Sequence, residues 1–351
     1  MSITVNAQRG VALLTILLLV VSITVVAGAM LASQKVAIRR SGLLFDQNQL
    51  LQDIDAGQQL AVTMIRADSQ LNDTDSERDI WAQPIPPYTL ANHSISIELR
   101  DEAGRFNINN LYQGGAVNTA ALAVFQRLLT QLNLETDIAV AVLDWQDADS
   151  DVYQDGGDES TVYAKQLNGT ANGALPNQPF VSIDQLQEVR GVSAEALATM
   201  RPYLTAVPYY VPININAASP VLLAALIDDA TSQQMQGLVD ARARQALTST
   251  DEIWQLANLS DVDDAQRQAI VPLLAVDSQA FMALITANDN AVTDNGRGRQ
   301  RFATVLISKT AVNDSQQSNN NQTPNGSNTD SDTPKEIKVV GQRLWAFRPS
   351  F

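Results

Sequence analysis

An uncharged apolar run near the N-terminus constrains this chain more than any other feature. Residues 11–31, VALLTILLLVVSITVVAGAML, carry no charge and are long enough to cross the roughly 30 Å hydrocarbon core of a bilayer. Proline is absent from residues 11–66, and apolar side chains continue beyond the run at helical intervals. The sequence therefore predicts one helix over 11–66 that leaves the membrane and becomes amphipathic.

The polar leader in front of this run admits three interpretations. In the first, the run belongs to a signal peptide that is cut after Ala27–Ala29, and in the second it is a simple membrane anchor. In the third, a prepilin peptidase cuts between Gly10 and Val11 and leaves the run on the mature chain. The uninterrupted helix favours the third interpretation, because a signal peptide would be removed from it. Three basic residues follow the run and only Arg9 precedes it, which does not favour an exported C-terminal part.

The amphipathic part of the helix carries an apolar stripe that must be covered by the chain's own domain, by partners, or by both. Its N-terminal part is expected to lean on partner helices. The stripe is formed by Leu43, Leu44, Leu50, Leu51 and Ile54.

Strand patterns flank a long helical block in the rest of the chain. Alternating residues predict the strands 93–100, 105–109, 279–286, 301–309 and 336–347. The Ala- and Leu-rich residues between them have helical periodicity. We therefore expect an α+β fold in which the long helix packs on a small antiparallel sheet, with a large α-helical domain inserted into it.

The expected domain boundaries follow from these patterns. A leader occupies 1–10 and the N-terminal helix 11–66; the α+β domain is built from 67–109 and 277–351, and the inserted helical domain covers 110–276. Residues 313–334 are rich in Asn, Ser, Gln, Thr and Asp, which predicts a disordered loop.

The helical block contains a degenerate duplication. Residues 182–193 resemble residues 249–260, each copy opens with a capping-box pattern, and an Asn-Ile-Asn motif precedes each copy, at 107–109 and 214–216. The copies predict two helix-hairpin-helix-like units, a motif that often binds DNA. No basic cluster flanks them and the net charge of the chain is −15, so packing or protein contact is the favoured role.

An acidic stretch is the part of the sequence with the chemistry of a binding site. Seven carboxylates fall within the sixteen residues from Asp144 to Glu159, at spacings that let several converge on a hard cation. Val152 stands where an EF-hand needs glycine, so we expect a calcium loop of another kind, for one or two ions, against the alternative of a solvated acidic loop. The expected Ca²⁺ ligands are Asp144, Asp147, Asp149, Asp151, Asp158 and Glu159.

Catalytic chemistry finds little support in the composition. The chain has no cysteine and a single histidine, His93, which is expected at the edge of a strand. Because neither a phosphate-binding glycine loop nor a nucleophile elbow is present in the sequence, we expect a protein that is not an enzyme.

The ordered set of motifs resembles the minor pseudopilin K family of bacterial type II secretion systems. The motifs are Arg9–Leu14, the two Asn-Ile-Asn repeats, Leu143–Trp145 with Asp147 and Asp149, Gly156–Gly157, Asn177–Phe180 and the hairpin at Gly191. The resemblance spans nearly the whole chain. In this chain Ser160 and Thr161 follow Glu159 where the family often carries further acids.

The resemblance implies a place and a set of partners for the chain. It implies cleavage and N-methylation at Val11, a single-pass inner-membrane protein with a periplasmic domain, calcium in the acidic loop, and a pseudopilus tip shared with minor pseudopilins I and J above the major pseudopilin. Pilins with a similar N-terminus usually carry Glu at the fifth mature position, whereas this chain has Thr15. An intramembrane carboxylate is costly unless it is paired, so Thr15 fits a subunit with no neighbour above it. The alternative that the duplicated hairpins favour is a DNA-binding or DNA-uptake pilus component.

Overall fold

The fold is described from a computed structural model, which covers residues 5–90, 92–163, 175–257, 259, 262–289, 299–311 and 335–351. The loop expected at 313–334 lies outside these residues, and side chains are described from Val11 onward.

Helices and strands alternate unevenly along the chain. The α-helices are α1 (Val5–Ser69), α2 (Thr119–Gln131), α3 (Asp137–Asp144), α4 (Glu159–Tyr163), α5 (Ala194–Met200), α6 (Pro220–Ala225), α7 (Gln236–Arg244), α8 (Glu252–Leu256) and α9 (Asp264–Ile270). The short 3₁₀ helices are η1 (Ile80–Ala82), η2 (Ile108–Leu111), η3 (Ile183–Glu188) and η4 (Val271–Leu273). The strands are β1 (Tyr88–Leu90), β2 (His93–Asp101), β3 (Phe106–Asn107), β4 (Tyr112–Gln113), β5 (Ala116–Val117), β6 (Leu204–Thr205), β7 (Ile213–Asn214), β8 (Leu274–Ala275), β9 (Ala280–Asp289), β10 (Arg299–Ala311) and β11 (Lys335–Trp345).

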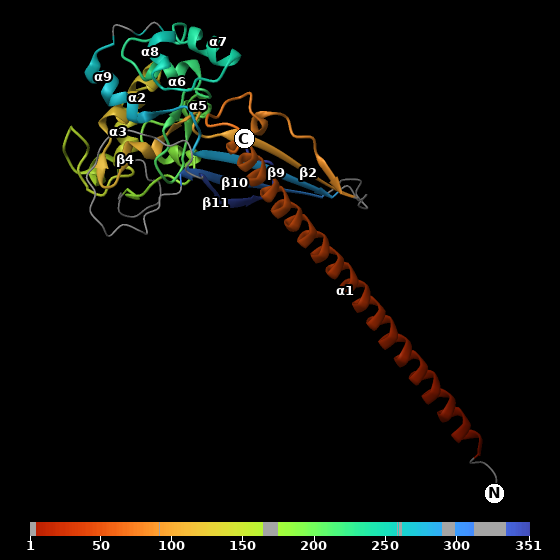
Figure 1. Cartoon of the computed structure of the whole chain (residues 1–351). Helices are drawn as coiled ribbons and strands as arrows, with labels where there is room; N and C mark the ends of the chain where they lie inside the picture. The colour runs from red at the N-terminus through yellow and green to blue at the C-terminus, as the bar shows by residue number, and fades with distance from the viewer. Residues whose placement is uncertain are drawn as a thin grey trace, which may run out of the picture.

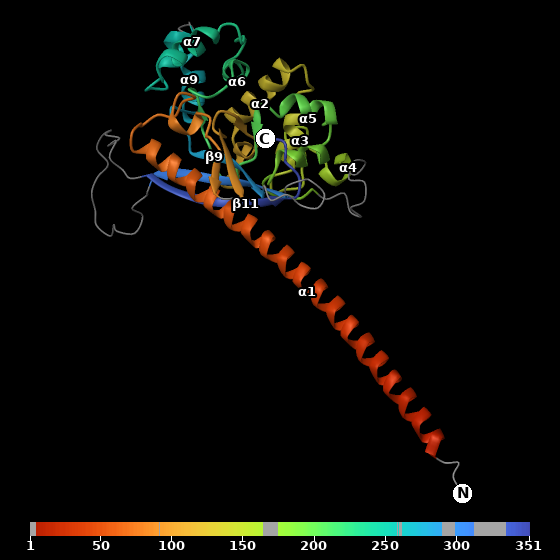
Figure 2. The same ribbon diagram turned by 90° about the vertical axis from the view of Figure 1, so that its right-hand side faces the viewer.

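Helix α1 is a single rod of 65 residues, about 100 Å long at 1.5 Å per residue. Its N-terminal half projects away from the rest of the molecule, and its C-terminal part lies along an antiparallel sheet of order β1-β2-β9-β10-β11 (Figures 1 and 2). Leu50, Ile54, Ala61 and Ile65 are buried against the sheet together with residues such as Ile285 and Val305. The predicted helix on an antiparallel sheet is therefore confirmed.

The second strand expected before the helical block, 105–109, is wrong as a strand of this sheet. Only Phe106 and Asn107 are extended, and they pair in parallel with β6, while η2 follows at once. Phe106 and Ile108 are buried in the core of the helical part. Alternation over five residues cannot distinguish a hairpin from two residues of extended chain that enter another core.

Gly57 lies where α1 packs closely on the sheet. A Cβ atom at this position would stand 2.6 Å from Cγ2 of Ile285 and 3.1 Å from Cγ2 of Ile95, whereas nothing lies within 4 Å of such an atom at Gly42. The helix tolerates the intrinsic cost of glycine here because the missing side chain lets the two backbones approach.

Gly57→Val is expected to lower the free energy of unfolding by about 1–3 kcal/mol, because the added methyl groups overpack the contact with β9. The matched substitution Gly42→Val changes an exposed position and is expected to alter stability by less than about 0.5 kcal/mol. Urea unfolding of the full-length protein in detergent, followed by near-ultraviolet circular dichroism, measures both. Equal stabilities of the two variants would contradict this close packing.

The helical part has its own large apolar core, which includes Phe125, Leu128, Trp145, Phe180 and Leu223. Helices α2 to α9 gather at the end of the sheet that is remote from the N-terminus of α1 (Figure 1). We call this part, together with β3 to β8, the helical head.

The two Asn-Ile-Asn motifs make equivalent hydrogen bonds inside the helical head. The Asn109 amide donates to the carbonyls of Phe180 and Val207, and its oxygen accepts from Phe180 N. The Asn216 amide donates to the carbonyls of Leu247 and Val276, and its oxygen accepts from Leu247 N. Each asparagine thus joins the start of one hairpin unit to its end, and the duplication is expressed in structure as well as in sequence.

The predicted capping box is complete at the first hairpin unit and partial at the second, where the start of α8 has no side-chain cap hydrogen bond. Ser182 and Gln185 form a capping box at the start of η3, and Ser249 N donates to Glu252 Oε1 at 3.1 Å at the start of the second copy. Gly191 has φ +83°, the left-handed conformation expected after the first helix. The corresponding Asn258 lies outside the described residues.

Candidate functional site

The N-terminal half of α1 is apolar and uncovered. The side chains of Leu13, Leu17 and Val21 are more than half exposed, and none of the most apolar stretch of this helix is buried within the molecule. The Thr15 hydroxyl donates to the Ala12 carbonyl at 2.9 Å, which satisfies it inside the helix. This part of α1 is long and apolar enough to span a membrane.

Three of the expected calcium ligands meet in a buried acidic centre of the helical head. Asp144 ends α3, Asp147 follows in the next turn, and Glu159 begins α4. Each offers a carboxylate oxygen, and these oxygens lie within 4.8 Å of one another. The exposed fractions of Asp144, Asp147 and Glu159 are 0 %, 3 % and 4 %.

The three carboxylates of the acidic centre differ in their hydrogen bonds. Asp144 accepts from the Tyr163 hydroxyl at 2.5 Å and from Tyr153 N at 3.2 Å. Oδ1 of Asp147 and Oε1 of Glu159 are buried and have no donor among the described residues. Buried carboxylate oxygens without donors are costly, and among the described residues no positive group pairs with these two oxygens.

The pKa values of the three carboxylates reflect the same burial and their mutual repulsion. Burial raises the pKa of Asp147 to about 7, and the neighbouring Asp149 and Asp144 add to the shift. Burial, followed by repulsion from Asp147 and Asp144, likewise raises the pKa of Glu159 to about 7. The pKa of Asp144 is raised by burial, although the Tyr163 hydrogen bond opposes this. A bound cation would oppose these shifts, because it favours the charged form of each carboxylate.

The remaining expected ligands lie at the rim of the acidic centre. Asp149, Asp151 and Asp158 are exposed; Asp149 Oδ1 accepts from Asp151 N at 2.9 Å, and Asp151 pairs with Asp158 in an isolated β-bridge. Gly156 and Gly157, at φ +66° and +106°, turn the chain so that Glu159 returns to Asp147. The loop is held by Val152, which is buried where an EF-hand has its glycine.

Tyr163 is the residue of this centre that the sequence analysis missed. It stands four residues after Glu159 on the same helix, so helical spacing could have placed its hydroxyl beside the acidic residues. Trp145 stacks on Phe180, with ring centroids 5.4 Å apart, and supports the centre from the apolar core. The arrangement offers oxygen ligands only, which suits a hard cation such as Ca²⁺.

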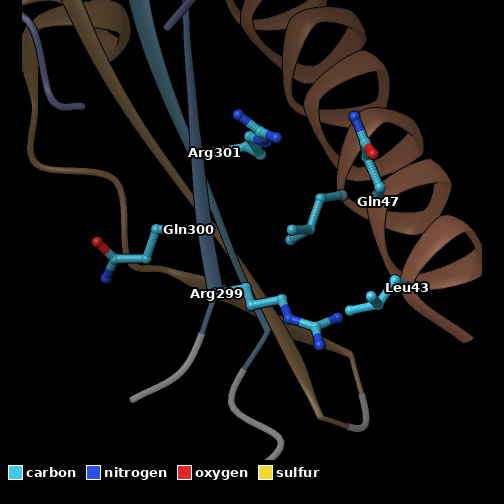
Figure 3. Close-up of a pocket in the computed structure, with 6 residues that line it drawn as sticks. Leu43, Gln47, Arg299, Gln300 and Arg301 are labelled. Carbon is cyan, nitrogen blue, oxygen red and sulfur yellow. The ribbon is translucent and has the colours of Figure 1, made fainter. Parts of the chain in front are cut away.

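A second feature is a pocket of about 350 Å³ where α1 leaves the sheet. Figure 3 shows Leu43 and Gln47 of the helix on one side, facing Arg299 and Arg301 of β10 on the other. Arg299 forms an ion pair with Asp46. Leu43 and Phe45 are 48 % and 70 % exposed, so this junction presents apolar surface beside charged groups.

Comparison with known proteins gives a consistent family. Models described as "Type II secretion system (T2SS), protein K" match residues 104–209 and 213–277. The type II secretion system protein K of Pseudomonas aeruginosa is 29 % identical over 258 residues, covering 70 % of this chain and 76 % of that protein. The protein of the same name from Klebsiella pneumoniae is 29 % identical over 311 residues, covering 84 % and 92 %.

A solved structure has the same fold. A chain in the crystal structure of the GspK-GspI-GspJ complex from the enterotoxigenic Escherichia coli type 2 secretion system superposes with a TM-score of 0.66 at 21 % identity, over 87 % of this chain and 99 % of that chain. The apolar N-terminal half of α1, the antiparallel sheet and the inserted helical head together define a pseudopilin whose N-terminal helix is long and apolar enough to span a membrane. The chain belongs to the type II secretion system protein K family.

Proposed function

We propose that this chain begins or caps the periplasmic pseudopilus of a type II secretion system, within a tip complex, and so supports protein export across the outer membrane. The observation that carries the proposal is the position of the helical head, which lies at the end of the molecule opposite the apolar half of α1 (Figure 1). Subunits of pilin-like filaments stack along their N-terminal helices. A bulky head at the far end would obstruct a further subunit above this one.

Thr15 supports the same position in the filament. Its hydroxyl is satisfied by the Ala12 carbonyl, so it needs no partner from a neighbouring subunit. A glutamate at this place would require one, because an unpaired carboxylate in a membrane is costly. A subunit at the end of a filament has no neighbour above to supply that partner.

The proposed partners are the minor pseudopilins I and J, with the major pseudopilin below. The solved relative was crystallised as a GspK-GspI-GspJ complex, which supports this choice. The half-exposed Leu43 and Leu44 and the exposed Phe45 offer a surface for partner helices. Co-purification of the full-length chain with I and J from solubilised membranes tests the proposal.

The DNA-uptake alternative receives no support from these comparisons, because the relatives described above are named as secretion proteins. The net charge of −15 also opposes binding to a phosphate backbone. The proposed role is structural, and membership of a secretion-apparatus family supports it.

Processing by a prepilin peptidase would leave the membrane helix on the mature protein, anchored in the inner membrane with the head in the periplasm. Mature protein isolated from membranes is expected to begin at Val11, with a methylated N-terminus, and Gly10→Leu is expected to block cleavage. N-terminal sequencing and intact mass check this. A mature chain that begins at Met30 would establish a signal peptide and refute this processing route.

Calcium is the ion that the acidic centre is proposed to hold. The buried, donor-free oxygens of Asp147 and Glu159 fit a bound cation. Asp144, Asp147 and Glu159 would hold it, and the exposed Asp149, Asp151 and Asp158 could complete the set for one or two ions. The ion would neutralise the buried charge and fasten α3 to α4.

A further inference from the structure

A second group of acidic residues lies where α1 ends and the chain turns toward the sheet. Asp68 is in the last turn of α1, Asp75 is in the following turn, and Asp79 precedes η1. Each offers a carboxylate oxygen, and these oxygens lie within 4.8 Å of one another. We call this group the stem-end cluster. It packs against the sheet, whereas the acidic centre lies within the core of the helical head.

Two side chains of the stem-end cluster are buried with an oxygen that lacks a donor. Asp68 and Asp75 are each 1 % exposed, and among the described residues no donor reaches Oδ2 of Asp68 or Oδ1 of Asp75. The other oxygen of Asp68 receives only long contacts, from Ile80 N at 3.3 Å and from the Asn72 amide at 3.4 Å. Both orphan oxygens belong to residues that converge on one point, so they indicate a missing positive partner.

The nearby lysine neutralises only part of this charge. Lys309 of β10 is buried and pairs with Oδ2 of Asp75, which also accepts from Ser278 N at 2.8 Å. Three carboxylates and one ammonium leave a net charge of −2, and Asp101 and Asp277 add negative potential at Asp75. Burial, with Asp79 and Asp75, raises the pKa of Asp68 to about 6. A divalent cation would balance the remaining charge.

The chemistry of the available ligands selects the class of ion. The stem-end cluster offers three carboxylates and therefore only oxygen ligands, while Asn72 approaches Oδ1 of Asp68 and of Asp79 with its amide NH2 donor. Oxygen-only sets favour hard cations, and a buried site with three carboxylates suits Ca²⁺ better than Mg²⁺, which keeps most of its water.

We propose that Asp68, Asp75 and Asp79 form a second calcium site, separate from the acidic centre. The bound ion would hold the C-terminal end of α1 against the sheet. The Asp75 carbonyl accepts from the Asn214 amide at 2.9 Å, so the same turn also contacts the helical head. An ion here would therefore connect three parts of the molecule at one point. These parts are α1, strand β10 through the Asp75–Lys309 pair, and the helical head.

Calcium binding to the full-length protein in detergent micelles, measured by isothermal titration with calcium chloride, tests this site. Asp147→Ala provides a background in which the acidic centre is disabled. In that background we expect one ion per chain, which Asp68→Asn or Asp79→Asn removes. Asp73→Asn is the matched control, because Asp73 is exposed in the same acidic segment and outside the stem-end cluster, and it is expected to retain the ion.

Thermal melting separates loss of the ion from loss of the fold. In chelator, Asp68→Asn is expected to melt no lower than its parent, because it removes a buried charge. Calcium is expected to raise the melting temperature of the parent but not that of Asp68→Asn. Asp79→Asn, at a half-buried position, serves if Asp68→Asn does not fold. The site is refuted if the Asp147→Ala protein binds no calcium at millimolar concentration, or if calcium binding survives Asp68→Asn and Asp79→Asn. Absence of calcium binding would indicate a proton shared within the stem-end cluster, and survival of binding in both variants would place the ion elsewhere in the chain.

Discussion

In saturating calcium, Asp147→Ala is expected to lower the melting temperature of the helical head by about 5–10 °C. A ligand present at one hundred times its dissociation constant stabilises the folded state by about 2.7 kcal/mol, and the variant loses this contribution. In chelator the sign is expected to reverse, because alanine removes one of three buried, mutually repelling carboxylates. Differential scanning calorimetry of the full-length protein, with and without chelator, measures both effects.

Asp155→Ala is the matched control for this prediction. Asp155 is an exposed carboxylate of the same loop and is not one of the three buried residues, so its removal is expected to preserve most of the calcium response. Calcium affinity is also expected to fall as the pH is lowered through 7, because Asp147 and Glu159, whose pKa values are raised to about 7, bind protons in competition with the ion. A calcium response that Asp147→Ala leaves unchanged would contradict the acidic centre as a calcium site.

Leu43→Asp is expected to abolish recovery of the tip complex while leaving the fold intact. Leu43 is 48 % exposed where α1 leaves the sheet, beside Arg299 of β10, so a negative charge costs little in the free protein. In an apolar contact with a partner helix, the same unpaired charge costs several kcal/mol, enough to reduce affinity by about a thousandfold. Co-purification and melting temperature of the same full-length variant separate binding from folding.

Ile54→Asp supplies the opposite control. Ile54 is fully buried between α1 and the sheet, so this variant is expected to lose about 3–5 kcal/mol of stability. The apolar stripe is therefore divided: Leu50 and Ile54 belong to the chain's own core, and Leu43 and Leu44 are left for partners. Leu50 was expected in the stripe that faces partners as well as the chain's own domain, but it is only 2 % exposed, so Leu50→Asp is expected to weaken folding more than assembly.

The long-range periodicity of the sequence was sufficient to predict the main architecture. Apolar spacing without proline predicted α1, and alternating residues predicted the strands β2, β9, β10 and β11. Residues 105–109 were misread, because the partner of Phe106 and Asn107 is β6, almost one hundred residues away. Local patterns carry no information about such a pairing.

The candidate sites were predictable to different degrees. Carboxylates at alternate positions predicted a cation site in the acidic loop. The sequence does not show, however, that Asp144, Asp147 and Glu159 are buried together while Asp149 and Asp151 face solvent. The stem-end cluster was missed because its members belong to a helix end, a turn and a cap, and share no periodic spacing. Their convergence depends on the turn after α1, which tertiary packing determines.

Co-expression of the full-length chain with minor pseudopilins I and J, followed by purification through a tag on this chain, tests the central claim most directly. The proposed tip role predicts one complex that contains the three proteins in equal amounts and that survives size-exclusion chromatography in detergent. When Leu43→Asp replaces the wild type, the same purification is expected to recover this chain without the two partners. Recovery of this chain alone, with the melting temperature of a folded protein, would contradict a tip complex built on this subunit.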